Sequence, residues 1–100
     1  RWQTLEVDVA AIVACVDNGG DAPVMLDLTP TEFSLLATLL RSPAHPFSRQ
    51  YLLEHCLPES EALERVVDTH IYNLRKKLEA AGISGVLINV RGVGYRFRQP

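Results

Sequence analysis

The sequence predicts an α+β domain, on three observations that follow one another along the chain. Residues 2–28 are rich in β-branched and apolar residues and contain a strong turn signal, DNGGD. Between residues 29 and 82, apolar residues recur every three or four positions, which is the helical period. Two β-rich runs, VLINV and YRFRQ, then flank a glycine-containing turn. The predicted order is therefore a sheet, three helices and a hairpin.

The N-terminal region reads as strands because short apolar and β-branched runs are separated by turn residues. TLEVDVA alternates in part, AIVACV is a short apolar run, and APVMLDL follows the DNGGD turn. These runs predict an antiparallel sheet of three or four strands.

Capping residues and a proline predict where the first helix begins and ends. Thr29 is a good N-cap, Pro30 suits the first helical position, and Glu32 completes a capping box. Ser42 and Pro43 end the helix, because the residue before a proline disfavours the helical conformation. One apolar face is predicted, made of Phe33, Leu36, Leu39 and Leu40.

The second helix is shorter and follows an Ala-His-Pro turn. Phe47 is expected in a very short strand, Ser48 caps the helix, and Pro58 stops it. Its inward side chains are expected to be Leu52, Leu53 and Cys56. The acidic stretch PESEALE then leads as a loop into the third helix.

The third helix is predicted over residues 62–81, with Gly82 as its C-terminal cap. A buried stripe follows from the helical period and consists of Val67, Ile71, Leu74 and Leu78. The opposite face holds Arg65, Thr69, Tyr72, Asn73 and Lys76. It is flanked on one side by His70 and Lys77, and on the other by Asp68 and Arg75.

The outward stripe has no carboxylate, whereas a face chosen for solubility favours Glu–Lys pairs. Its cations suit phosphates, and its Thr, Tyr and Asn side chains suit base edges. Two interpretations stay open from the helix alone: a DNA-reading face and an ordinary solvated face. The order of elements favours the first, since a helix pair that presents its later helix is the helix-turn-helix arrangement.

Charge is distributed unevenly along a chain of net charge −2. Residues 65–100 carry seven Lys or Arg and two acids, a formal +5, whereas residues 1–64 carry three Lys or Arg and ten acids, a formal −7. Such an asymmetry indicates a local anion-binding surface on an acidic body.

No catalytic or metal-ligand spacing is present, and neither a metal nor a cofactor is expected. The sequence lacks CxxC, HxxxH, HExxH and GxSxG patterns, so an enzyme is not expected. Cys15 and Cys56 are interpreted as reduced, buried thiols of a cytoplasmic protein, with a disulfide as the alternative. No apolar run reaches the ~18 residues that would span a bilayer, so no membrane contact is expected.

Four segments, in order, resemble a known family: LTPTEFSLLATLL, FSRQYLLEHC, ERVVDTHIYNLRKKL and NVRGVGYRF. Together they closely resemble the winged-helix effector domain of OmpR/PhoB-type bacterial response regulators, over about residues 28–98. The resemblance implies one winged helix-turn-helix domain over residues 1–100, with an N-terminal four-stranded antiparallel sheet, three helices and a C-terminal hairpin wing. No receiver domain is recognised in these residues.

The resemblance also implies a function. The third helix would enter the major groove of promoter DNA, and the wing would enter the minor groove. Members bind direct repeats as homodimers or tandem pairs and contact RNA polymerase. A sensor kinase controls them through a receiver domain. The alternative from a different class is a winged helix whose acidic body binds another protein.

Residue roles follow from the resemblance position by position. Base contacts are expected from Thr69, Tyr72 and Asn73, and phosphate contacts from Arg65, His70, Arg75, Lys76 and Tyr95. Arg91 matches the wing residue that enters the minor groove. Two of these have a second expectation: Arg75 is partly tied to Asp68, and Tyr95 closes the core.

The sequence departs from the family at three places. Asn73 stands where some members have Arg, so the base preference is not carried over. Ala-His-Pro at 44–46 and Cys-Leu-Pro at 56–58 replace the usual turn residues. The short acidic loop would contact RNA polymerase through Glu59, Ser60 and Glu61, or would serve as a plain connector.

Overall fold

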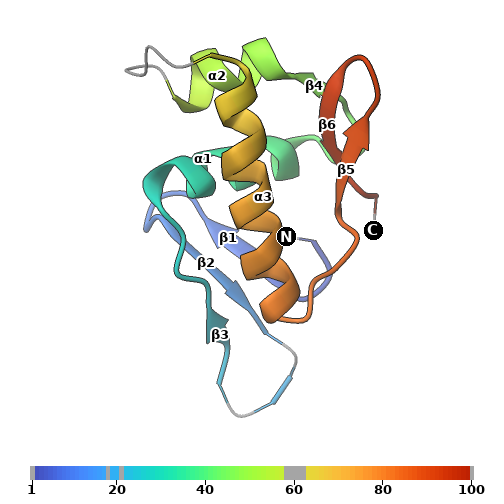
Figure 1. Cartoon of the computed structure of the whole chain (residues 1–100). Helices are drawn as coiled ribbons and strands as arrows, with labels where there is room; N and C mark the ends of the chain where they lie inside the picture. Colours follow the sequence, from blue (N-terminus) through green and yellow to red (C-terminus); the bar gives the residue numbers. More distant parts are fainter. Residues whose placement is uncertain (1, 18, 21, 58–62, 100) are drawn as a thin grey trace.

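Two small sheets flank three helices in the computed structural model, which describes residues 2–17, 19–20, 22–57 and 63–99 (Figure 1). The elements in chain order are β1 (Leu5–Asp8), β2 (Val13–Val16), β3 (Val24–Met25), α1 (Pro30–Arg41), β4 (Phe47–Ser48), α2 (Arg49–Cys56), α3 (Arg65–Ala80), β5 (Leu87–Val90) and β6 (Gly94–Phe97). The predicted α+β order of sheet, helices and hairpin is confirmed. None of the described helices is long and apolar enough to cross a membrane.

The N-terminal sheet is antiparallel, in the order β1-β2-β3. It has three strands among the described residues, so the expectation of four is not confirmed. Before β1, Trp2 pairs with Leu5 as an isolated antiparallel bridge, with the N–H of each donating to the carbonyl of the other. Gln3 takes a φ of 49° between them, and this left-handed backbone turns the chain back at once. Residues 2–5 thus form a tight turn closed by one bridge.

The second sheet has the order β4-β6-β5 and contains the predicted hairpin. The short strand expected at Phe47 is confirmed, since Phe47 pairs with Tyr95 and Ser48 with Gly94. A Cβ atom added at Gly94 would lie 2.0 Å from the carbonyl oxygen of Phe47. Only glycine therefore lets β4 and β6 approach this closely.

The predicted caps of α1 and α2 are confirmed. The backbone N–H of Glu32 donates to Thr29 Oγ1 (3.1 Å), and the N–H of Thr29 donates to Glu32 Oε1 (3.0 Å), which completes the capping box. The N–H of Tyr51 donates to Ser48 Oγ at 3.0 Å. Both helices thus begin where local side chains satisfy their free N–H groups.

Helix α3 is shorter than expected at both ends, because it spans Arg65–Ala80. The N–H groups of Val66 and Val67 bond three residues back, to Leu63 and Glu64, and Glu64 makes no side-chain cap. Position 62 and the expected stop at Pro58 lie outside the described residues.

The C-terminal end of α3 follows the glycine signal. Gly82 has a φ of 88°, its N–H donates to the carbonyl of Glu79 (3.0 Å), and the N–H of Ile83 donates to that of Leu78 (2.8 Å). This pair of bonds is a Schellman motif, which needs the left-handed conformation that glycine adopts without strain. The predicted role of Gly82 is confirmed.

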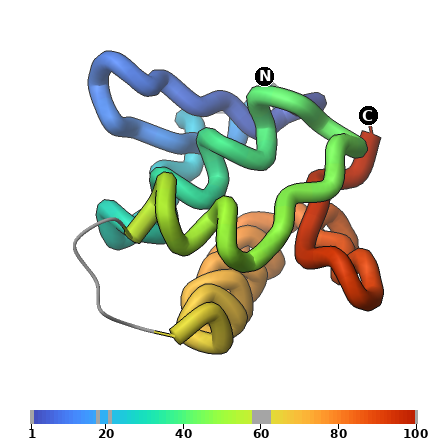
Figure 2. The backbone as a smooth tube through the Cα atoms, turned by 90° about the horizontal axis from the view of Figure 1, so that it is seen from above, coloured from blue at the N-terminus to red at the C-terminus, as the bar shows by residue number. Residues whose placement is uncertain are grey.

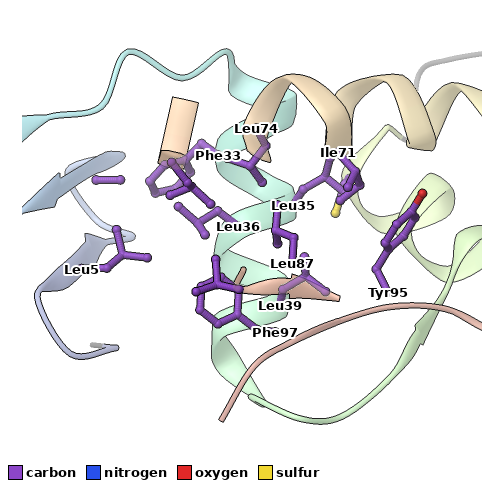
Figure 3. Packing of buried hydrophobic residues seen from close by; sticks show 14 of the residues in the cluster. Leu5, Phe33, Leu35, Leu36, Leu39, Ile71, Leu74, Leu87, Tyr95 and Phe97 are labelled. Atoms are coloured by element: carbon purple, nitrogen blue, oxygen red, sulfur yellow. The ribbon is translucent and has the colours of Figure 1, made fainter. Parts of the chain in front are cut away.

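One apolar core joins all parts of the fold. Viewed from above, α1 lies between the N-terminal sheet and α3 (Figure 2). Figure 3 shows Leu5 of the N-terminal sheet, Leu36 of α1, Leu74 of α3 and Phe97 of the hairpin converging on one another. Burial of this shared surface supplies the main stabilisation and fixes α3 against the hairpin.

The beginning of the chain is fixed to its last strand. Trp2 is 2% exposed, its indole Nε1–H donates to the carbonyl of Arg98 at 2.6 Å, and its ring meets Phe97 edge to face at 5.3 Å. Cys15 and Cys56 are both free, as predicted; Cys56 is buried in the core, whereas the prediction of burial is wrong for Cys15, which is half-buried on β2.

Candidate nucleic-acid interface

Helix α3 divides into the two predicted faces. Its stripe of Val67, Ile71, Leu74 and Leu78 is fully buried, which turns the opposite face to solvent. The five residues predicted for that face are all exposed: Arg65, Thr69, Tyr72, Asn73 and Lys76. Glu79 is also exposed and lies seven residues, or two turns, after Tyr72. The predicted stripe from Arg65 to Lys76 thus holds no carboxylate, and Glu79 adds one beyond it, near the C-terminal end of α3.

Tyr72 and Lys76 form a pair in the middle of this face. They are four residues apart, and the Lys76 ammonium lies 5.1 Å from the centre of the Tyr72 ring. A hydrogen bond with Tyr72 raises the pKa of Lys76, because this bond favours the charged ammonium. The face presents a ring, with 53% of Tyr72 exposed, beside a cation.

Two flanking residues of α3 have partners within the fold. Arg75 Nη2 donates to the carbonyl of Leu87 at 2.9 Å, which joins α3 to the start of β5. Lys77 Nζ donates to Glu32 Oε1 at 2.7 Å. The expected tie of Arg75 to Asp68 is wrong, because other residues occupy that carboxylate. His70, also on a flank, is half-buried.

Asp68 is the centre of a polar cluster that spans three elements. Its Oδ1 accepts from Arg49 Nε of α2 at 2.7 Å and from the hydroxyl of Tyr95 on β6. The guanidinium of Arg49 also lies 5.1 Å from the centre of the Tyr95 ring. We call Arg49, Asp68 and Tyr95 the Asp68 cluster.

Burial and hydrogen bonding act in opposite directions on Asp68. Burial alone would raise its pKa, but the hydrogen bonds from Tyr95 and Arg49 outweigh it, so the pKa of Asp68 is lowered. The pKa of Tyr95 is raised by burial and by its bond to Asp68. At neutral pH the cluster therefore holds a carboxylate, a guanidinium and a neutral phenol.

Tyr95 meets one of its two expectations. It is 5% exposed, and Figure 3 shows its ring at the edge of the apolar cluster, so it closes the core as predicted. Its only hydroxyl proton is donated to Asp68. A phosphate contact by this hydroxyl stays a prediction, and it would require the proton to leave Asp68.

Sequence reasoning missed Arg49. One signal was present: a cation at the first position of a helix is unfavourable beside the positive end of the helix dipole. A cation in that place indicates a partner elsewhere in the fold, and here the partner is Asp68.

The wing projects at the same end of the molecule as the start of α3 (Figure 1). Arg91 is exposed in the turn between β5 and β6, where Gly92 takes a φ of 79° and the N–H of Val93 donates to the carbonyl of Val90 at 2.9 Å. The guanidinium of Arg98, by contrast, covers the Trp2 ring at 5.5 Å. Arg91 is thus the wing cation nearest the hairpin tip.

The remaining expected site falls between α2 and α3 in the sequence. Glu59, Ser60 and Glu61 are outside the described residues, so their contact with RNA polymerase stays untested. Within the described ranges, no three His, Cys, Asp or Glu side chains gather as metal ligands would.

The sequence of the chain is similar to that of a known protein family. Residues 22–97 match the family described as "Transcriptional regulatory protein, C terminal". The chain belongs to this family. It is a family of transcriptional regulators rather than of enzymes, and the resemblance to OmpR/PhoB-type effector domains is confirmed.

The relatives include regulators from several bacteria. BaeR of Escherichia coli O6:H1 is 48% identical over 75 residues, which are 73% of this chain and 31% of BaeR. PhoB of Klebsiella pneumoniae is 46% identical over 79 residues, which are 78% of this chain and 34% of PhoB. This family member thus spans about a third of the length of those relatives.

Solved structures agree with the fold. The DNA-binding domain of the response regulator AdeR, in complex with an intercistronic region, has a TM-score of 0.90 and 39% identity, and covers 99% of this chain and 98% of that domain. The DNA-binding domain of CpxR from E. coli has a TM-score of 0.82 and 28% identity, and covers 99% of this chain and 94% of that domain. The fold of this family member is therefore a winged helix of class α+β with three helices.

Proposed function

We propose that this domain binds double-stranded DNA sequence-specifically, as the output domain of a bacterial two-component response regulator, and so controls transcription. One observation carries the proposal: the exposed face of cations and hydrogen-bonding side chains on α3 begins at Arg65, at the end of the molecule where the cationic wing tip projects. The family match supports it, as does the AdeR domain, whose structure includes an intercistronic region.

In this proposal the exposed face of α3 contacts both base edges and phosphates. Base edges in the major groove would be read by Thr69, Tyr72 and Asn73, which are exposed in the middle of α3. Phosphates would be bound by Arg65, His70, Arg75, Lys76 and Tyr95, and the minor groove would receive Arg91. Arg65 is the clearest phosphate ligand, because it is exposed at the first turn of α3 and none of the contacts described above occupies it.

The partners of the whole regulator belong to the same proposal. The domain would act in the cytoplasm on direct repeats, as a homodimer or tandem pair. It would contact RNA polymerase through Glu59, Ser60 and Glu61, and receive its signal from a sensor kinase through a receiver domain. The length of the relatives leaves room for a receiver domain, since the chain corresponds to about a third of each.

Two variants separate affinity from sequence preference. Arg65→Ala should weaken binding to every duplex alike and lower the salt slope by about 1, because one phosphate contact is lost. Asn73→Ala should instead change which duplexes bind, by about 1–3 kcal/mol for a lost base contact. Selection from a random-sequence duplex library, followed by titration of the selected duplex at several salt concentrations, measures both effects.

The matched control is Ser84→Ala, which changes an exposed residue outside α3 and should alter neither quantity. If Asn73→Ala leaves the selected sequence unchanged, the assignment of Asn73 to bases fails. If the dimerised wild-type regulator binds no duplex in a salt-dependent manner, the whole proposal fails, and a protein-binding role for the acidic body becomes the better account.

A further inference from the structure

We propose that Asp68 is a positioning residue that holds the tip half of the wing against α3, so that the two DNA grooves are contacted together. This inference rests on the proposed function and adds a residue that makes no DNA contact itself. The Asp68 cluster would set the position of the wing relative to α3, while other residues make the contacts with DNA.

The contacts of Asp68 place it where it can do this. One oxygen of its carboxylate accepts from Arg49, the first residue of α2, and from Tyr95 on the wing strand β6. The same side chain belongs to α3 and precedes Thr69 directly. A single carboxylate therefore joins the three elements whose relative placement decides how the domain meets a duplex.

The position along the hairpin matters as much as the contact. Arg75 holds the base of the wing, through the carbonyl of Leu87, which pairs with Phe97. Tyr95 follows Gly94, the β6 residue paired with Val90 at the tip end of the ladder. Asp68 is thus the polar tie described nearer to Arg91, and its loss would free the half of the wing that carries Arg91.

If Asp68 acted only through its charge, neutralising it would strengthen DNA binding, whereas loss of a positioning residue would weaken DNA binding. The Asp68 side chain is 42% exposed and lies one turn after Arg65, close to the expected path of the phosphates. A carboxylate there repels DNA, so a residue with no positioning role would bind DNA better once neutralised. The sign of the effect therefore distinguishes the two roles.

A double-variant cycle between Asp68 and Arg91 tests the proposal. With the duplex selected by the wild-type regulator, Arg91→Ala should weaken binding roughly tenfold, as expected for one groove contact. Asp68→Asn should also weaken it roughly tenfold, because a neutral amide oxygen accepts from Arg49 and Tyr95 more weakly than the carboxylate does. In the Asp68→Asn background, Arg91→Ala should then cost little more, since the freed wing no longer delivers Arg91.

Two further variants make the cycle decisive. Glu64→Gln removes an exposed negative charge beside Arg65 without touching the Asp68 cluster, and should slightly tighten binding to all duplexes. Tyr95→Phe keeps the Arg49–Asp68 pair and the ring in the core, so it serves even if Asp68→Asn fails to fold. It should reduce the effect of Arg91→Ala, whereas loss of a phosphate contact by Tyr95 would leave that effect unchanged.

Different results would overturn this proposal and the proposed function. The proposal is overturned if Asp68→Asn binds the selected duplex at least as tightly as the wild type, or if Arg91→Ala costs the same factor in all backgrounds. Either result leaves the proposed function intact, because the wild-type regulator still selects a duplex. Failure of the wild type to bind any duplex refutes the proposed function instead.

Discussion

Gly94→Ala is expected to lower the free energy of unfolding by about 3 kcal/mol, at the upper end of ordinary overpacking. The new methyl group would lie 2.0 Å from the carbonyl oxygen of Phe47 and 3.0 Å from the Cα of Ser48. Both are backbone atoms, so no side chain can rotate away to make room. β4 and β6 would have to separate, and their pairing of Ser48 with Gly94 would be lost.

Urea unfolding of Gly94→Ala beside Gly20→Ala measures this effect. Gly20 is the matched control, because a Cβ added there meets no atom within 4 Å. Its substitution should change stability by no more than about 0.5 kcal/mol. Equal losses in the two variants would show that the close approach of β4 and β6 does not constrain the fold.

Lys77→Met is expected to cost about 2 kcal/mol at neutral pH, because it removes one partner of a mostly buried ion pair. The side chain of Glu32 is 3% exposed, while that of Lys77 is 37% exposed, so solvent screens part of the interaction. Glu32 would keep its bond from the N–H of Thr29 but would lose the only cation described beside it.

The loss should depend on pH in a definite direction. Burial would raise the pKa of Glu32, but its bonds to Lys77 and Thr29 outweigh burial and lower it. The pair thus stabilises the fold above the ordinary value of 4.5 and loses its effect as pH falls through the folded pKa. Without Lys77, the pKa of Glu32 should be higher than in the wild type, so the difference in stability between variant and wild type should shrink in acid.

Urea unfolding across the acid range checks this prediction. Lys76→Met is the control for a lost positive charge, since its ammonium is exposed on the outer face of α3. The double variant Glu32→Gln, Lys77→Met should recover part of the loss, because no buried charge remains. A loss for Lys77→Met that is constant across pH would contradict the role of Glu32.

The features that the sequence predicted well are those decided within one helical turn. Thr29, Pro30 and Glu32 define the start of α1 among themselves, and Gly82 ends α3 through bonds to the turn before it. The two faces of α3 follow from the helical period, because one face is entirely apolar. Recognition of the family then added the wing and the roles of exposed residues such as Arg91.

The features that it missed are decided by distant partners. Periodicity places Arg75 and Asp68 on one side of α3, but the partners of Asp68 are 19 and 27 residues away. Competition between Arg49, Tyr95 and Arg75 for one carboxylate is settled only by tertiary packing.

The attachment of Trp2 to the last strand gives the molecule a built-in optical reporter. Trp2 is the only tryptophan in the 100-residue sequence, and its indole is enclosed by Phe97 and Arg98. Its fluorescence therefore reports on the seam between the first residues and β6, while circular dichroism reports on the helices. A red shift of the emission ahead of helix loss would show that this seam opens as a separate step.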